Sequence, residues 1–148
     1  GGPPLPGGGG VIALKTAIYG KMAGSAFATA IGSRLYDGRV PQNPVSPYAV
    51  FFIVSTVPDR TFTEDMLDIL LQFSIFSSSA EQTEILAANA ALVALYDKAV
   101  LSASGSKQIF IELASGEGEV TDYPGDTLAG TDAFFQSDVE FNVKLSRS

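Results

Sequence analysis

The residues best suited to chemistry are a group of three carboxylates, Glu64, Asp65 and Asp68. Paired carboxylates can perform acid–base chemistry or hold a divalent metal ion. Adjacent residues of a strand point to opposite faces, so Glu64 and Asp68 can share a face but Asp65 cannot. The chain has no histidine to complete such a site. The pattern therefore favours a solvated entrance to a strand, and a metal-dependent enzyme that uses Glu64 and Asp68 is the weakest alternative.

A second acidic group lies in the glycine-containing segment Gly116–Gly130 and just beyond it. Its members are Glu117, Glu119, Asp122, Asp126 and Asp132. Their spacing lacks the regular alternation of a calcium-binding loop. We expect a solvated, mobile loop here. A small binding module that presents this loop to a ligand is an alternative of another class.

The composition excludes the most common types of catalytic site. The 148 residues include neither cysteine nor histidine. Thiolate and imidazole nucleophiles, Ser-His-Asp triads, the usual zinc sites and disulfide bonds are therefore excluded together. We expect a protein that is not an enzyme and has no catalytic residues, cofactor or metal ion.

The net charge of the chain argues against tight binding to nucleic acid. Nine Lys and Arg residues against sixteen Asp and Glu residues give a net charge of −7. Tight binding to phosphate groups requires a positively charged surface. A negatively charged surface repels phosphates, and would let a DNA duplex move past the protein without binding to it. Ordinary solubility explains the charge equally well. No apolar run reaches the length of about 18–20 residues that a membrane helix needs, so we expect a soluble protein with no membrane partner.

The first ten residues, Gly1–Gly10, form a Gly/Pro-rich arm that cannot build a helix or a ladder. Such an arm is ordered only if a neighbouring subunit or its own domain holds it. Gly7–Gly10 resemble a phosphate-binding turn only weakly, because no strand precedes them and no Gly-Lys-Ser/Thr follows. We expect an arm over residues 1–10 and a single domain over residues 11–148. Because the chain starts at Gly1 without a methionine, we expect a processed or incomplete start.

Four strands are predicted from alternation and apolar content. The segment 65–76 has one apolar face, formed by Leu67, Ile69, Leu71, Phe73 and Ile75. The segment 48–57 is apolar at nearly every position, which predicts a central strand covered on both faces. It is expected to pair with 65–76 as an antiparallel hairpin. Two more strands are expected over 108–113 and 134–145, and residues 34–36 are read as a short strand or extended segment.

Two main helices are predicted. Val11, Leu14, Ile18 and Met22 share one face of the first, which Gly24-Ser25 ends. Ser25 can then cap a short turn over 26–30 that Gly32 closes. The second helix is expected to start at a capping box, either Ser78 with Glu81 or Ser79 with Gln82, and to end at Lys98. Its core residues are expected to be Ile85, Leu86, Leu92, Val93 and Tyr96. The fold class is therefore α+β, a mainly antiparallel sheet of about four strands packed against two helices.

Six segments, read in order, resemble a family of phage tail-completion (tail terminator) proteins. They are Leu14-Lys-Thr-Ala-Ile-Tyr19, Arg34-Leu-Tyr-Asp-Gly38, Pro47-Tyr-Ala-Val-Phe-Phe52, Phe62-Thr-Glu64, Leu71-Gln-Phe-Ser-Ile-Phe76 and Ala94-Leu-Tyr-Asp-Lys98. The resemblance covers about residues 11–101 and rests on order and spacing. The arm and the region after Gly105 depart from the family's pattern.

The resemblance implies a structural subunit of a virion, assembled in the host cytoplasm and located in the tail or neck. It implies a ring, typically a hexamer, that caps the tail tube and meets the head connector. DNA would pass through the lumen without specific binding. Another neck, head-completion or tail-tube subunit is the alternative within this class. We expect the following residues at interfaces: Leu5, Pro6, Asp59, Arg60, Thr61, Tyr123, Asp126 and Phe134.

Overall fold

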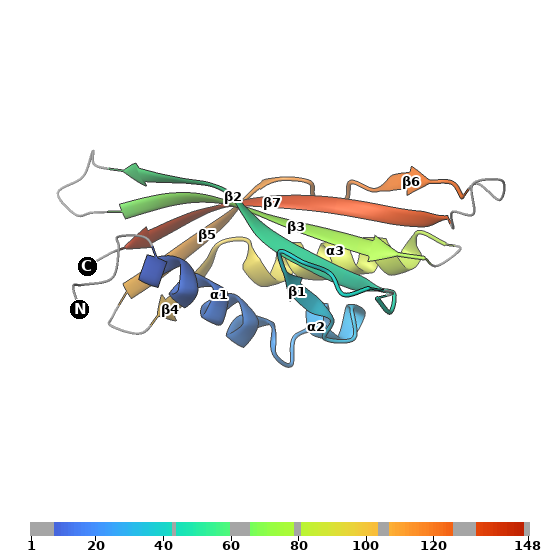
Figure 1. Cartoon of the computed structure of the whole chain (residues 1–148), viewed down its shortest axis with the longest axis horizontal. Helices are drawn as coiled ribbons and strands as arrows, with labels where there is room; N and C mark the ends of the chain where they lie inside the picture. Colours follow the sequence, from blue (N-terminus) through green and yellow to red (C-terminus); the bar gives the residue numbers. More distant parts are fainter. Residues whose placement is uncertain are drawn as a thin grey trace.

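The computed structural model describes residues 8–42, 44–59, 66–78, 81–103, 107–125 and 133–146. Within them, three helices and seven strands follow one another along the chain (Figure 1). In order they are α1 (Gly8–Met22), α2 (Ala26–Ala30), β1 (Leu35–Asp37), β2 (Tyr48–Asp59), β3 (Met66–Ser77), α3 (Thr83–Tyr96), β4 (Ala99–Ala103), β5 (Lys107–Ser115), β6 (Thr121–Tyr123) and β7 (Phe134–Ser146).

All seven strands form one sheet in the order β1-β2-β3-β7-β5-β4, with the short β6 pairing on β7. The pairs are antiparallel except β1 with β2, which is parallel. The α+β class and the β2–β3 hairpin are confirmed. The expectation of about four strands is too low: residues 34–36, read as a short strand or extended segment, are part of β1, and β4 and β6 are too short to show a clear periodicity. The third helix is the short α2, which the sequence predicts as a turn over residues 26–30.

The N-terminal helices follow the predicted pattern. Helix α1 buries Leu14, Ile18 and Met22, and it begins at Gly8, inside the segment assigned to the arm. The Ser25 hydroxyl accepts a hydrogen bond of 3.1 Å from the Ala28 amide, which confirms the cap of α2. The cap of α2 and the end of α1 before Gly24 are therefore as predicted, but the expectation that no helix forms within residues 1–10 is wrong, because α1 begins at Gly8.

Helix α3 differs from its prediction at both ends. It starts at Thr83 with Gln82 as N-cap and without a side-chain capping hydrogen bond, so the predicted capping box of Ser78 with Glu81 is wrong. Ser79, of the alternative box with Gln82, lies outside the described residues. It ends at Tyr96, and Lys98 lies beyond it with a left-handed φ of 62°. Leu86 is exposed, contrary to its predicted place in the core. The four other predicted core residues of the helix are buried: Ile85, Leu92, Val93 and Tyr96.

Phe73 on β3 is the hub of the core. Its ring centroid lies 5.2 Å from that of Tyr96 and 5.7 Å from that of Phe141. Phe51 and Phe27 approach it at 5.8 and 6.4 Å. All five rings are fully buried between the sheet and the helices. These contacts join β2, β3 and β7 to α2 and α3, and fix which face of the sheet points inward.

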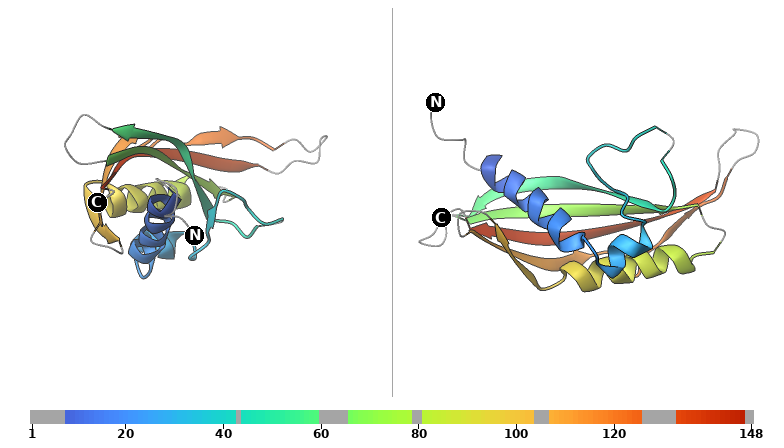
Figure 2. Two further views of the ribbon diagram at one scale, coloured as in Figure 1. Left: turned by 60° about the vertical axis from the view of Figure 1, so that its left-hand side comes forward. Right: turned by 90° about the horizontal axis from the view of Figure 1, so that it is seen from below.

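All three helices cover the same face of the sheet, and the opposite face carries none of the described elements (Figures 1 and 2). We call this opposite surface the bare face. The prediction that β2 is covered on both sides is wrong: Ala49 and Phe51 point into the core, but Phe52 and Val57 are 36% and 55% exposed on the bare face. The near-continuous apolar run of β2 therefore contributes side chains both to the core and to the exposed bare face. No helix among the described residues is both long and apolar enough to cross a bilayer.

Candidate functional site

An aromatic row crosses one end of the bare face. Its members come from five strands: Tyr36 (β1), Tyr48 (β2), Phe76 (β3), Phe134 (β7) and Tyr123 (β6). Successive ring centroids lie 6.2, 5.1, 6.2 and 4.8 Å apart, and the second and fourth pairs are stacked. Burial raises the pKa of the Tyr48 hydroxyl, and the electrostatic interaction with Tyr36 adds a smaller contribution in the same direction. The row is therefore a continuous aromatic surface that the rest of the chain leaves partly exposed.

Helix α3 anchors the Tyr123 end of the row. The buried Asn89 side chain donates to the Gly116 carbonyl at 3.0 Å and to the Ser137 hydroxyl at 2.7 Å, and its oxygen accepts from the Gly118 amide at 2.9 Å. Ser137 in turn donates to the Glu119 carbonyl at 2.7 Å. The turn before β6 is therefore fixed, and the described part of the predicted mobile loop is a turn and a strand.

Arg34 anchors the other end of the row. Its Nε donates to the Pro47 carbonyl at 2.9 Å, directly before Tyr48. Its own carbonyl accepts from the Ala49 amide at 2.9 Å. The short strand β1 and the start of β2 are thus held in register, which places the rings of Tyr36 and Tyr48 side by side.

A shallow hollow of about 400 Å³ lies beside the centre of the row. Its aromatic walls are Tyr48, Phe76 and Phe134, and Pro44 and Ala133 add apolar surface. Its remaining lining residues are polar: Ser46, Ser77 and Ser78. The hollow is mostly apolar, with hydroxyl groups along one side.

A hydrogen-bonded polar patch separates the row from the rest of the bare face. Ser74 donates to Asp138 at 2.7 Å, and Gln72 donates to Ser74 at 3.1 Å. Gln136 donates to Asp138 at 3.0 Å. These side chains satisfy one another's hydrogen bonds, so the patch is suited to packing against another surface.

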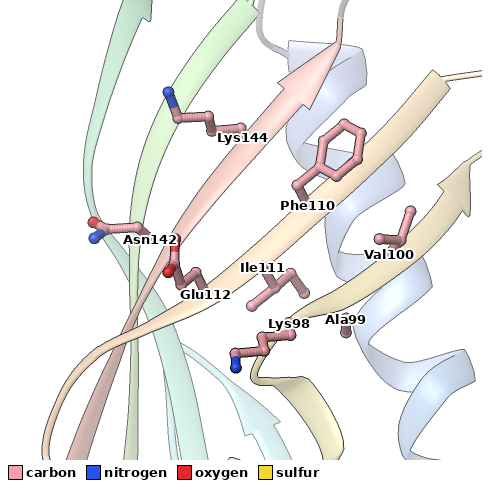
Figure 3. A pocket seen from close by; sticks show the side chains of 8 residues that line it. All are labelled: Lys98, Ala99, Val100, Phe110, Ile111, Glu112, Asn142 and Lys144. Atoms are coloured by element: carbon pink, nitrogen blue, oxygen red, sulfur yellow. The ribbon is translucent and has the colours of Figure 1, made fainter.

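A second row crosses the opposite end of the bare face. Strand register places Val57, Asp68, Lys144, Phe110 and Val100 side by side from β2 to β4, and we call these five residues the distal row. Lys144 lies 3.8 Å from Asp68. Figure 3 shows Lys144, Phe110 and Val100 around an open hollow of about 210 Å³ with Glu112 and Asn142. Val57 and Val100 are 55% and 61% exposed.

The predicted carboxylate groups do not form a site in the described residues. Asp68 pairs with Lys144, and Glu117, Glu119 and Asp122 are exposed on the turn and edge of β6. Glu64, Asp65, Asp126 and Asp132 lie outside the described residues. Over the ranges that the structure describes, no three acidic side chains come together as metal ligands.

The structure brings two of the predicted interface residues together, since Tyr123 stacks on Phe134. Asp59 closes β2 at the opposite end of the sheet. Leu5, Pro6, Arg60, Thr61 and Asp126 lie outside the described residues. Sequence reasoning missed the other three members of the aromatic row, although Phe76 occupies the non-core alternation of its strand.

The described residues form a small α+β fold whose sheet is covered by helices on one face and carries partly exposed aromatic and aliphatic side chains on the other (Figure 1). The model of the tail completion protein gp17 family matches residues 16–117, which is more than half of the chain, and the chain therefore belongs to this family. The family consists of structural proteins of phage virions, located in the tail or neck.

Among the solved structures that match the chain, one shares its fold over nearly the whole length. It is a chain described as "Virion of native gene transfer agent (GTA) particle", with a TM-score of 0.74 and 18% sequence identity. The match covers 93% of this chain and 97% of that chain. At this identity the likeness concerns the fold. No curated protein sequence matches the chain.

Proposed function

We propose that this protein is a tail terminator: copies of it close into a ring, typically a hexamer, that caps the tail tube and meets the head connector. The observation that carries the proposal is the bare face, where an aromatic row and a distal row remain open on a sheet whose other side is fully packed. Contiguous exposed apolar surface marks a protein contact.

The two rows differ in chemistry, which favours a head-to-tail contact. The aromatic row consists of aromatic residues alone, whereas the distal row has the Asp68–Lys144 pair at its centre, with apolar residues on either side. A contact between two different surfaces generates a ring when its rotation closes and a filament when it does not. A terminator requires closure, because an open contact would let subunits add without limit.

The charge supports passage of DNA through such a ring. The whole chain has a net charge of −7, with sixteen acidic residues against nine basic ones. An acidic wall repels phosphates, so a duplex would move through the lumen without specific binding.

Tail length in a phage that lacks this protein tests the proposed function. We expect tubes of irregular, excessive length without heads, and restoration of normal particles when the wild-type chain is supplied. Tubes of normal length that lack only the head would instead indicate a head-side completion protein. Normal, infectious particles without the protein would overturn the proposal.

A further inference from the structure

We propose that the aromatic row is the docking site for the proline-rich arm of a neighbouring copy, Pro3-Pro4-Leu5-Pro6. The inference rests on the proposed ring, because it names what one subunit contributes to the next. It is carried by three observations: the chemistry of the row, the chemistry of the arm, and the distance between the arm's attachment point and the row.

The row and its hollow have the features of a site that binds polyproline. Proline-rich segments with two prolines three positions apart adopt a polyproline II helix and dock in aromatic-lined grooves. Here Tyr48, Phe76 and Phe134 line the hollow. The hydroxyls of Tyr36, Tyr48 and Tyr123 form no hydrogen bond within the described ranges, and they can donate to the carbonyl groups of such a segment.

The arm supplies the matching ligand. Residues 3–6 read Pro-Pro-Leu-Pro, so Pro3 and Pro6 have the required spacing. The segment carries no charged side chain, which suits a site whose lining residues are all uncharged. Proline also lowers the entropy cost of ordering the arm on a partner.

The arm of the same copy cannot reach the row. Helix α1 begins at Gly8 beneath the end of the sheet where β7 finishes, whereas the row lies where β7 begins, on the opposite face (Figures 1 and 2). Seven residues extend at most about 25 Å. The 13 residues of β7 span about 43 Å at about 3.3 Å per residue. An arm on the row must therefore come from another copy, as a ring of such subunits allows.

Disulfide trapping between separately purified variants tests this arrangement, because the full chain has no native cysteine. One variant carries Leu5→Cys and the other Ser78→Cys, an exposed position beside the hollow. The matched control is Ser102→Cys, an exposed serine on β4 at the far end of the bare face. After mixing, assembly and mild oxidation, we expect at least ten times more Leu5–Ser78 than Leu5–Ser102 cross-linked dimer.

A second variant tests the chemistry of the arm. Replacing Pro3, Pro4 and Pro6 together with alanine should reduce the Leu5–Ser78 cross-link at least fivefold and leave the melting temperature unchanged, because these residues precede the first helix. Equal cross-linking would overturn the role of the prolines.

The remaining outcomes separate this inference from the proposed function. Intact rings without the Leu5–Ser78 cross-link would overturn the arm contact and leave the terminator proposal standing, with another surface or tail protein covering the row. A chain that neither assembles nor cross-links would overturn both proposals.

Discussion

Asn89 and Gly116 are joined by a hydrogen bond of 3.0 Å from the Asn89 side chain to the Gly116 carbonyl, although 27 residues separate them. This bond ties helix α3 to the turn that leads into β6, and so to Tyr123 at the end of the aromatic row. The aromatic row therefore depends on a polar network on the other side of the sheet.

Removing the Asn89 side chain should loosen this turn. Asn89→Ala leaves the Gly118 amide and the Gly116 carbonyl without their partner, and we expect a loss of about 2–3 kcal/mol in the free energy of unfolding. The matched control is Asn142→Ala on the bare face, which should change it by less than about 0.5 kcal/mol. Urea denaturation followed by circular dichroism measures both, and equal effects would contradict the proposed anchor.

Gly116 should tolerate no side chain. Its φ is +102°, and a methyl group there would overlap the carbonyl oxygen of Asp138. We expect Gly116→Ala to cost about 2 kcal/mol or more, from backbone strain and the displacement of β7. Gly118 also has a positive φ but has open space around it, so Gly118→Ala should cost about 1 kcal/mol. Thermal melts of the two variants compare these effects, and a milder effect at Gly116 would refute the close approach.

Phe73 should contribute more to stability than any exposed ring. Phe73→Ala removes the ring that touches four other buried aromatics, and a loss of about 3–5 kcal/mol is expected. Phe52→Ala, at a position that is 36% exposed on the bare face, should cost less than about 1 kcal/mol. Equal losses in denaturant titrations would show that the core is not centred on Phe73.

Tyr96 should make the protein sensitive to alkaline pH. Burial raises the pKa of its phenol, which donates to the Ile18 carbonyl at 2.7 Å. The unfolded chain loses this proton first as pH rises, near pH 10, so the Tyr96 contribution is fully present below about pH 10 and is lost above it.

Tyr96→Phe isolates this effect, because Tyr19 and Tyr48 also have raised pKa values. The variant should be about 1 kcal/mol less stable than the wild type at about pH 7, where the hydrogen bond is lost. Its free energy of unfolding should fall less than that of the wild type between about pH 10 and pH 11. Parallel pH profiles would rule out Tyr96 as the sensor.

The distal row should matter for assembly and little for folding. Val100→Ser with Phe110→Ser replaces side chains that are 61% and 40% exposed, so the melting temperature should change by less than about 5 °C. We expect the double variant to lose ring formation in size-exclusion chromatography with light scattering. Leu86→Ser, at an exposed leucine on α3, is the control and should assemble normally. Normal assembly of the double variant would exclude the distal row from the contact.

The sequence predicted the elements whose side chains have a clear period. The alternation in β3 and β7 and the spacing of Leu14, Ile18 and Met22 identified the buried faces, because burial imposes these periods. The apolar run of β2 led to the wrong prediction that both faces of this strand are buried. An exposed apolar face and a buried apolar face give the same pattern in the sequence.

The candidate site was only partly predictable. Tyr123 and Phe134 were expected at an interface, and they stack on each other. Tyr36, Tyr48 and Phe76 join them through the pairing of β1 with β2, of β2 with β3 and of β3 with β7, and the last of these joins strands far apart along the chain. Local patterning carries no information about this order of strands.

A reconstruction of the head-side end of the intact tail tests the central claim most directly. We predict one closed ring of this chain between the tail tube and the connector, with the bare face of each subunit covered by its neighbours. A tail end that lacks this chain, or holds it as isolated copies with the bare face open to solvent, would contradict the account.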